Sequence, residues 1–136
     1  MTEQVETPPM RGVIPYLNLV GAADAAELYK TAFGAIEHRR APAEDGQRLM
    51  HCHLEINGGS LMLSDCFPEH GYDFQPSHSF TMQLVVDDID RWFQRAVDAG
   101  LEVTNPVALM FWGDRWGSLK DRFGVHWAMN QPAGQA

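Results

Sequence analysis

An internal repeat constrains the fold of this chain more than any other feature of its sequence. The stretch DAAELYKTAFGA has apolar residues at the i, i+3, i+4, i+7 spacing of one helix face, namely Ala25, Leu28, Tyr29 and Ala32. The stretch DDIDRWFQRAVDAG repeats that pattern 64 residues later, at Ile89, Trp92, Phe93 and Ala96. The repeat predicts two helices that occupy equivalent places in two similar modules.

Residues that favour helix ends flank both apolar runs. Asp24 and Asp88 stand where N-caps are expected, because a carboxylate can accept hydrogen bonds from the free N–H groups of a first helical turn. Gly34 and Gly100 follow the runs and are expected as C-caps.

Strand-like segments surround each helix in the same order. One precedes each helix, at 13–20 and at 79–86. Three follow the first helix, at 36–40, 48–56 and 60–65, and three follow the second, at 101–104, 116–120 and 125–130. Gly58-Gly59 and Phe123-Gly124 provide the turns before the last strand of each set. The predicted element order is βαβββ twice, which is an α+β fold.

This order divides the chain into two modules with short extensions. We expect a flexible N-terminal tail (1–11), a first module (12–66), a linker (67–78), a second module (79–130) and a C-terminal tail (131–136).

Composition narrows the classes of function. The chain has 136 residues, of which 45% are hydrophobic, so it can bury a core. Its net charge of -8 argues against nucleic-acid binding, which needs a basic face. No apolar run approaches the ~20 residues of a membrane span, and the polar start MTEQVETPPM is unlike a signal peptide. With only two cysteines, Cys52 and Cys66, we expect a reduced, cytoplasmic protein without a disulfide framework.

Three stretches give the pattern a more specific meaning: PYLNLVGAADAAELYKTAFGA, LMLSD and FWGDRWGSLKDRFGVHW. With the two βαβββ modules, they resemble the vicinal oxygen chelate superfamily, and within it the PhnB-like branch of glyoxalase/bleomycin-resistance-type proteins. The resemblance covers roughly residues 12–130. It implies that the strands of the two modules curl into a U-shaped cleft. It also implies a homodimer, with modules either side by side or swapped between chains and with cleft walls from both.

The resemblance also indicates where a metal would bind. Metal-dependent members place His, Gln or Glu ligands on the first and last strands of each module. Carried over one at a time, those positions fall on Ile14, Leu63, Thr81 and Ala128. These side chains do not bind a divalent metal, since such ions prefer imidazole, thiolate or carboxylate ligands. We therefore predict no cofactor at these positions.

A different group offers an alternative metal site. His51, His53 and Glu55 alternate along one predicted strand, so they share a face. At ~3.3 Å per residue they extend over about 13 Å, too far for all three to reach one ion. The preferred interpretation is a polar strand face, and a divalent metal held by two of them and a further group remains the alternative.

Alternation also predicts a ligand-binding face without a metal. Tyr16 and Asn18 share the face of Ile14, Gln83 that of Thr81, and His126 that of Ala128. Trp112 and Trp116 could hold a flat aromatic ligand between them, or could instead be packed in the core or the dimer interface. Arg115 could pair with an anionic ligand or with an aspartate such as Asp114, Asp121 or Asp65, whereas Trp127 is expected in the core. The predicted ligand-binding residues are Tyr16, Asn18, Thr81, Gln83, Trp112, Arg115, Trp116 and His126.

Three functions fit these observations. The first is a glyoxalase/bleomycin-resistance-like homodimer that binds a small aromatic or anionic molecule in a metal-free cleft, acting either as a binding protein or as an enzyme. The second is a metal-dependent lyase or isomerase of the glyoxalase class with non-standard ligands. The third is a dimeric interaction module whose cleft is filled by its own side chains. Bound metal would favour the second, quenching of tryptophan fluorescence by a ligand the first, and neither the third.

Overall fold

The first half of the chain forms one βαβββ module. The computed structural model describes residues 8–134. The elements of this module are β1 (Tyr16–Leu19), α1 (Ala22–Phe33), β2 (Ile36–Pro42), β3 (Leu49–Ile56) and β4 (Gly59–Asp65). Its sheet has the order β1-β4-β3-β2. The first pair of neighbours is parallel, and the other two pairs are antiparallel.

The second half repeats this topology. Its elements are β5 (Met82–Val85), α2 (Ile89–Asp98), β6 (Glu102–Leu109), β7 (Arg115–Lys120) and β8 (His126–Gln131). The sheet order is β5-β8-β7-β6, again with one parallel pair. A short 3-10 turn, Pro68–His70, lies in the linker. The predicted α+β fold with two βαβββ modules is confirmed.

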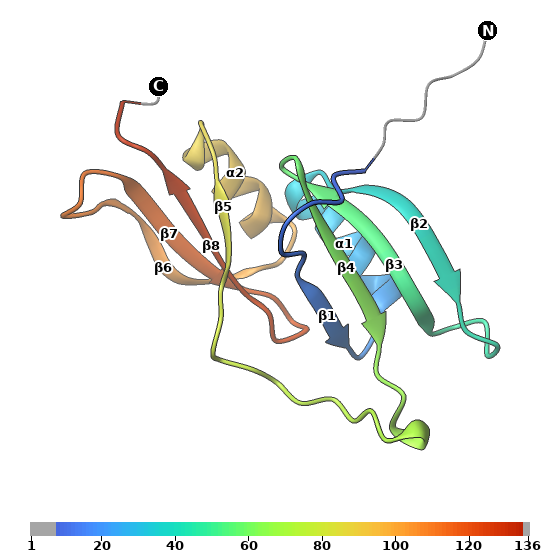
Figure 1. Cartoon of the computed structure of the whole chain (residues 1–136). Coiled ribbons are helices and arrows are strands. Elements are labelled where there is room, and N and C mark those ends of the chain that lie inside the picture. Colours follow the sequence, from blue (N-terminus) through green and yellow to red (C-terminus); the bar gives the residue numbers. More distant parts are fainter. Residues whose placement is uncertain (1–7, 135–136) are drawn as a thin grey trace, which may run out of the picture.

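The two modules share one hydrophobic core. α1 packs on β3 and β4, α2 packs on β6, β7 and β8, and the two helices contact each other (Figure 1). Aromatic rings of both modules meet there, since Phe33 of α1 lies 4.5 Å from Trp127 of β8 between ring centroids. Trp127 is buried, as predicted. Each sheet therefore has one face on the shared core and one open face turned away from it.

The start of α1 differs from the prediction. Its N-cap is Gly21, and Asp24 lies in the first turn instead. The capping carboxylate comes from Asp65 at the end of β4, which accepts hydrogen bonds from the N–H groups of Gly21 (2.8 Å) and Ala22 (3.0 Å). A distant side chain thus does what a local one was expected to do.

The other helix ends follow the prediction more closely. Gly34 caps α1 in the left-handed conformation. Asp88 caps α2, where its carboxylate accepts a hydrogen bond from the N–H of Arg91. α2 ends with Ala99 as its cap, one residue before the predicted Gly100.

Each predicted tail contains residues that belong to the adjacent module, the N-terminal tail to the first and the C-terminal tail to the second. Residues 1–7 and 135–136 lie outside the described residues. Pro9 is half-buried and its carbonyl accepts a hydrogen bond from the Ser60 hydroxyl, so the chain just before β1 packs on the first sheet. β8 runs on to Gln131, inside the range predicted as the C-terminal tail. Within residues 8–134, no helix has the length and apolar character needed to cross a membrane.

Candidate functional site

The strand register assigns side chains to the open face of the first module. Tyr16 is paired with Met62, and Asn18 with Ser64, so these four side chains share a face. Their chain neighbours Leu17 and Leu63, among others, are buried toward α1. Tyr16 and Asn18 are therefore on the open face, where the alternation predicts them.

Three histidines lie on or beside this open face, each with a different oxygen partner. The Tyr16 hydroxyl is 3.0 Å from Nδ1 of His51. Nε2 of His53 is 2.7 Å from the Ser60 hydroxyl, and Nε2 of His38 is 2.9 Å from a Glu55 carboxylate oxygen. Since the three imidazoles point to separate partners, they do not converge on one point.

His53 is the buried member of this group. Its side chain is 5% exposed, and the hydroxyl of its partner Ser60 donates to the Pro9 carbonyl of the N-terminal segment. Burial lowers the pKa of His53, and the nearby His38 and His51 lower it further. The folded protein therefore favours neutral His53.

We expect the stability of the protein to fall as the pH drops through the range below 6.5. Because the pKa of His53 is lower in the folded chain than the unfolded value of about 6.5, the unfolded chain binds this proton first on acidification. Melting temperatures measured from pH 8 to pH 5 should fall more in the wild type than in His53→Gln. The exposed His70→Gln is the matched control and should keep the wild-type slope. If the melting temperatures of the wild type and His53→Gln fall equally with pH, the lowered pKa of His53 does not cause the acid destabilisation.

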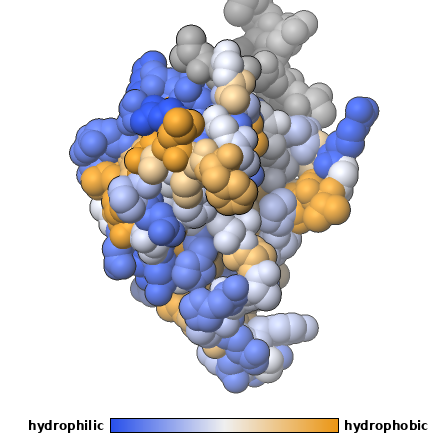
Figure 2. Space-filling model, turned by 90° about the vertical axis from the view of Figure 1, so that its left-hand side faces the viewer, coloured by the Kyte–Doolittle hydropathy of each residue, from blue (hydrophilic) through white to orange (hydrophobic). Residues whose placement is uncertain are grey.

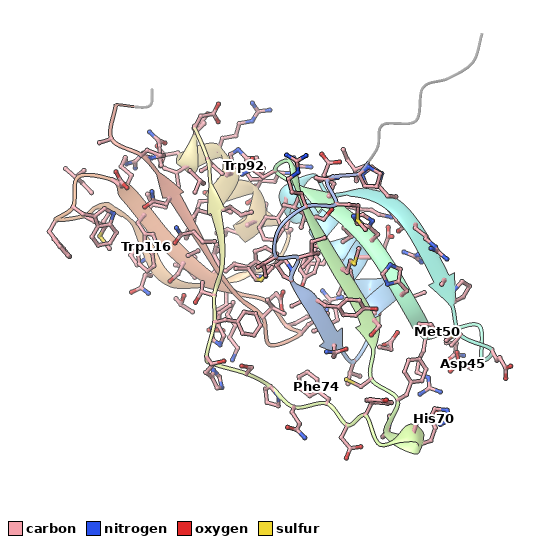
Figure 3. All side chains as sticks on the ribbon, in the orientation of Figure 1. Asp45, Met50, His70, Phe74, Trp92 and Trp116 are labelled. Atoms are coloured by element: carbon pink, nitrogen blue, oxygen red, sulfur yellow. The ribbon has the colours of Figure 1, made fainter. Side chains whose placement is uncertain are left out.

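A large pocket opens at one end of this face. It has a volume of about 1330 Å³ and lies between the first sheet, the β2–β3 connection and the linker. Figure 3 labels Asp45, Met50 and His70 around it. Its aromatic and polar lining includes Tyr16, Asn18, Ser64, Phe67 and Tyr72. The pocket therefore combines apolar walls with hydrogen-bonding groups, as small-molecule sites usually do.

The charges around this pocket do not favour an anionic ligand. Its one arginine, Arg48, already forms ion pairs with Asp45 (2.7 Å) and Glu69 (2.6 Å). The same guanidinium lies 4.4 Å from the centroid of the Phe67 ring. Glu44 and Asp73 add further acidic groups to the lining. Burial raises the pKa of the Cys66 thiol, which also lines the pocket, so this group stays protonated at neutral pH.

The open face of the second module carries the other predicted residues. Gln83 is paired with Ala128 in the parallel register of β5 and β8, and His126 lies two residues earlier on the same face of β8. Trp116 and Lys120 of β7 are paired with Asn130 and His126 of β8. Thr81 and Gln83 are exposed, and His126 is half-buried.

The two tryptophans near this face are not arranged as a sandwich. Trp112 is 48% exposed and Trp116 is half-buried. Their ring centroids are 6.5 Å apart and their planes are inclined by 69°. A flat ligand fits between two indoles only when they are nearly parallel, so in this conformation it could stack on one of them but not between them.

Arg115 lies away from the open face. Its guanidinium forms a two-pronged pair with the Asp90 carboxylate of α2, at 2.9 Å for both contacts. This pair lowers the pKa of Asp90. The predicted structural role of Arg115 is therefore present with an unexpected partner, and we leave Arg115 out of the site.

Comparisons with known proteins agree with this architecture. The family model of the Glyoxalase/Bleomycin resistance protein/Dioxygenase superfamily matches residues 18–129. The chain belongs to this superfamily. A protein of Mycobacterium bovis is 40% identical over 87% of this chain and 81% of its own length.

Solved structures show the same fold. A crystal structure of a Pseudomonas aeruginosa protein matches with a TM-score of 0.73 and 27% identity, over 89% of this chain and 97% of that one. The PhnB protein from Bacillus cereus matches with a TM-score of 0.70 and 17% identity, over 90% of this chain and all of that one.

The superfamily positions for a metal can now be located in this chain. Leu63, which we placed at one of them, is fully buried on the helix side of β4 and does not reach the open face. The register puts Met62 and Ser64 on the open face instead. Neither these nor Ile14, Thr81 and Ala128 supplies an imidazole, thiolate or carboxylate, so the positions do not fit a divalent metal. Among residues 8–134, no three His, Cys, Asp or Glu side chains are grouped to hold one.

Sequence reasoning missed the linker as part of the site. Phe67 and Tyr72 shape the pocket, yet they lie in the segment that was interpreted as a linker. The cluster of aromatic residues in CFPEHGYDFQPSH was the available signal, because aromatic side chains in a polar loop usually need a surface to pack on.

Proposed function

We propose that this member of the glyoxalase/bleomycin-resistance superfamily binds a small aromatic molecule, with no metal at the four superfamily positions. The pocket beside β1 is the observation that carries the proposal. It is somewhat larger than the roughly 300–1,000 Å³ of ordinary small-molecule sites, so it has room for a drug-sized ligand. It also contains Tyr16 and Asn18, which strand alternation placed on the predicted ligand-binding face. Because Arg48 is already paired with two carboxylates, the proposal favours neutral or cationic aromatic ligands over anionic ones.

We further propose that a second copy of the chain completes the cleft. The open faces of the two modules are both turned away from the shared core, and the labelled Met50 and Trp116 lie on opposite sides of the view in Figure 3. The second module exposes a group of apolar side chains on and near its open face, including Val85 (54%), Leu109 (73%) and Phe111 (98%). Figure 2 shows apolar surface gathered on this side of the molecule. Such surfaces mark interaction sites, which supports a homodimer that brings Trp112, Gln83 and His126 of one copy toward Tyr16 of the other.

The ligand proposal is tested with matched planar aromatic compounds that are neutral, cationic or anionic. We expect saturable binding of neutral or cationic members by isothermal titration calorimetry. Tyr16→Ala should weaken it about three- to tenfold, since an aromatic contact contributes about 0.5–1.5 kcal/mol. Trp112→Ala should weaken it as well, and should change the melting temperature little because the side chain is half exposed.

Two results would decide against parts of this proposal. Absence of binding across the whole panel would remove the ligand proposal. Binding that responds to Tyr16→Ala but not to Trp112→Ala, in a protein that light scattering shows to be monomeric, would confine the site to the first module.

A further inference from the structure

Two histidines from distant parts of the chain meet beside the second sheet. Nδ1 of His78, in the linker, is 3.0 Å from Nε2 of His126 on β8. Their ring centroids are 5.1 Å apart and the ring planes are inclined by 57°. The hydrogen-bonded imidazoles of the first module, those of His38, His51 and His53, each face an oxygen atom. The pair of His78 and His126 is different, because two nitrogens face each other.

Two imidazole nitrogens at this distance can share either a proton or a metal ion. An N–H···N hydrogen bond needs one protonated and one unprotonated nitrogen. In a metal site both nitrogens are unprotonated, and each lies about 2.0–2.1 Å from a zinc ion. Two such ligands at the tetrahedral angle are then about 3.3 Å apart. The observed separation of 3.0 Å is a few tenths of an ångström shorter, so binding of one ion requires the two rings to turn until both nitrogens point at it.

We propose that His78 and His126 form a two-histidine site for a divalent transition metal ion of the Zn²⁺, Ni²⁺ or Cu²⁺ type. Imidazole is a preferred ligand of these ions, and the remaining coordination positions would be filled by water. The site is distinct from the superfamily positions, because His126 lies two residues before Ala128 and His78 three residues before Thr81. It has two protein ligands only, because residues 8–134 group no third His, Cys, Asp or Glu side chain with them.

The surroundings of the pair both favour and limit metal binding. His78 is exposed and His126 half-buried, so an ion can reach the two nitrogens from solvent. The net charge of -8 attracts cations to the protein as a whole. Lys120, the register partner of His126 on β7, places a positive charge nearby and should weaken the site.

A bound ion would also fix the linker. Residues 68–81 are exposed throughout, and the contact between His78 and His126 ties this segment to β8. Because the ion would bridge the same two atoms, it should hold the linker on the edge of the open face that carries Gln83 and His126. Metal binding would then stabilise one arrangement of the proposed cleft wall.

The test uses the metal ion alone and the full chain without an affinity tag. In titration calorimetry at pH 7.5 with Ni²⁺ and Zn²⁺, we expect one ion per chain. His78→Ala and His126→Ala should each weaken binding at least tenfold, and both side chains lie at the surface, so the variants should fold. His70→Ala, an exposed linker histidine whose ring neighbour is Phe67, is the matched control and should bind as the wild type does.

Two further readouts separate this site from adventitious binding. Electron paramagnetic resonance of the Cu²⁺ form should show coupling to two nitrogens, and to fewer in either single variant. Lys120→Gln should tighten binding by removing the nearby charge. Failure to bind any of the three ions, or affinities that stay the same in both histidine variants, would overturn the proposal. Neither result would bear on aromatic ligand binding, which is measured without metal.

Discussion

Replacement of Asp121 by asparagine is expected to lower the free energy of unfolding by about 3 kcal/mol or more. The Asp121 side chain is buried. One carboxylate oxygen accepts hydrogen bonds from the Tyr29 hydroxyl (2.6 Å) and the Trp127 indole N–H (2.9 Å). The other accepts from the backbone N–H groups of Phe123 (2.9 Å) and Val125 (3.0 Å). An asparagine has only one oxygen, and its NH₂ group would face two donors.

The size of the effect follows from how these bonds connect the molecule. Tyr29 belongs to α1 and Trp127 to β8, so the carboxylate joins the two modules inside the shared core. A hydrogen bond to a charged group contributes about 1.5–3 kcal/mol, and the substitution disrupts two of the four. Burial and the nearby carboxylate raise the pKa of Tyr29 well above its ordinary value, which keeps its hydroxyl protonated as the donor.

Denaturant unfolding measures this effect directly. Tyr29→Phe removes one donor and should be destabilising by less than Asp121→Asn. Asp98→Asn, an exposed position on α2 that accepts a hydrogen bond from Gln94, is the matched control and should unfold as the wild type does. A free energy of unfolding for Asp121→Asn within 1 kcal/mol of the wild type would show that the core tolerates the loss of these bonds.

The parts of the fold that could be predicted are those with a local repeating signal. The helix faces of Leu28 and Phe93 are buried, and burial is what produces the 3.6-residue pattern in the sequence. The cap of α1 shows the limit of such reasoning. The helix begins before Asp24, which therefore lies inside the first turn, and Asp65 accepts the hydrogen bonds of the first N–H groups because β4 ends beside the start of the helix.

The site shows the same division. Strand alternation placed Tyr16, Asn18 and Gln83 on open faces, because the period of two survives wherever one face is buried. The carry-over from the resemblance put Leu63 on the open face, whereas its pairing with Leu17 of β1 puts it on the buried face. Two other features had no periodic signal in the sequence: the ion pair of Arg115 with Asp90, and the pocket wall formed by the linker. Both depend on contacts between segments that are far apart in the chain.

Gly117 provides the second large effect that we expect. Replacement by alanine should destabilise the protein by about 1–3 kcal/mol, the range for an extra methyl group in a packed core. A Cβ at this position would lie 2.8 Å from a ring carbon of Phe93, 3.0 Å from a methyl group of Val107 and 3.2 Å from the Asn105 carbonyl oxygen. The backbone oxygen belongs to the neighbouring strand β6 and cannot rotate away as a side chain can.

Gly59→Ala is the matched control, because Gly59 also lies in a strand, and neither glycine has a positive φ. A Cβ there would meet only the Ile56 carbonyl oxygen at 3.7 Å, an ordinary contact. Denaturant unfolding should therefore show that Gly117→Ala is less stable than both Gly59→Ala and the wild type. Equal stabilities of the two variants would show that α2 can move away from β7.

The close approach of Phe93 to Gly117 sets the distance between α2 and the sheet, and that sheet carries Trp116 and His126 on its other face. A shift of α2 would therefore reach the open face through β7, so Gly117→Ala should also alter binding at the second module.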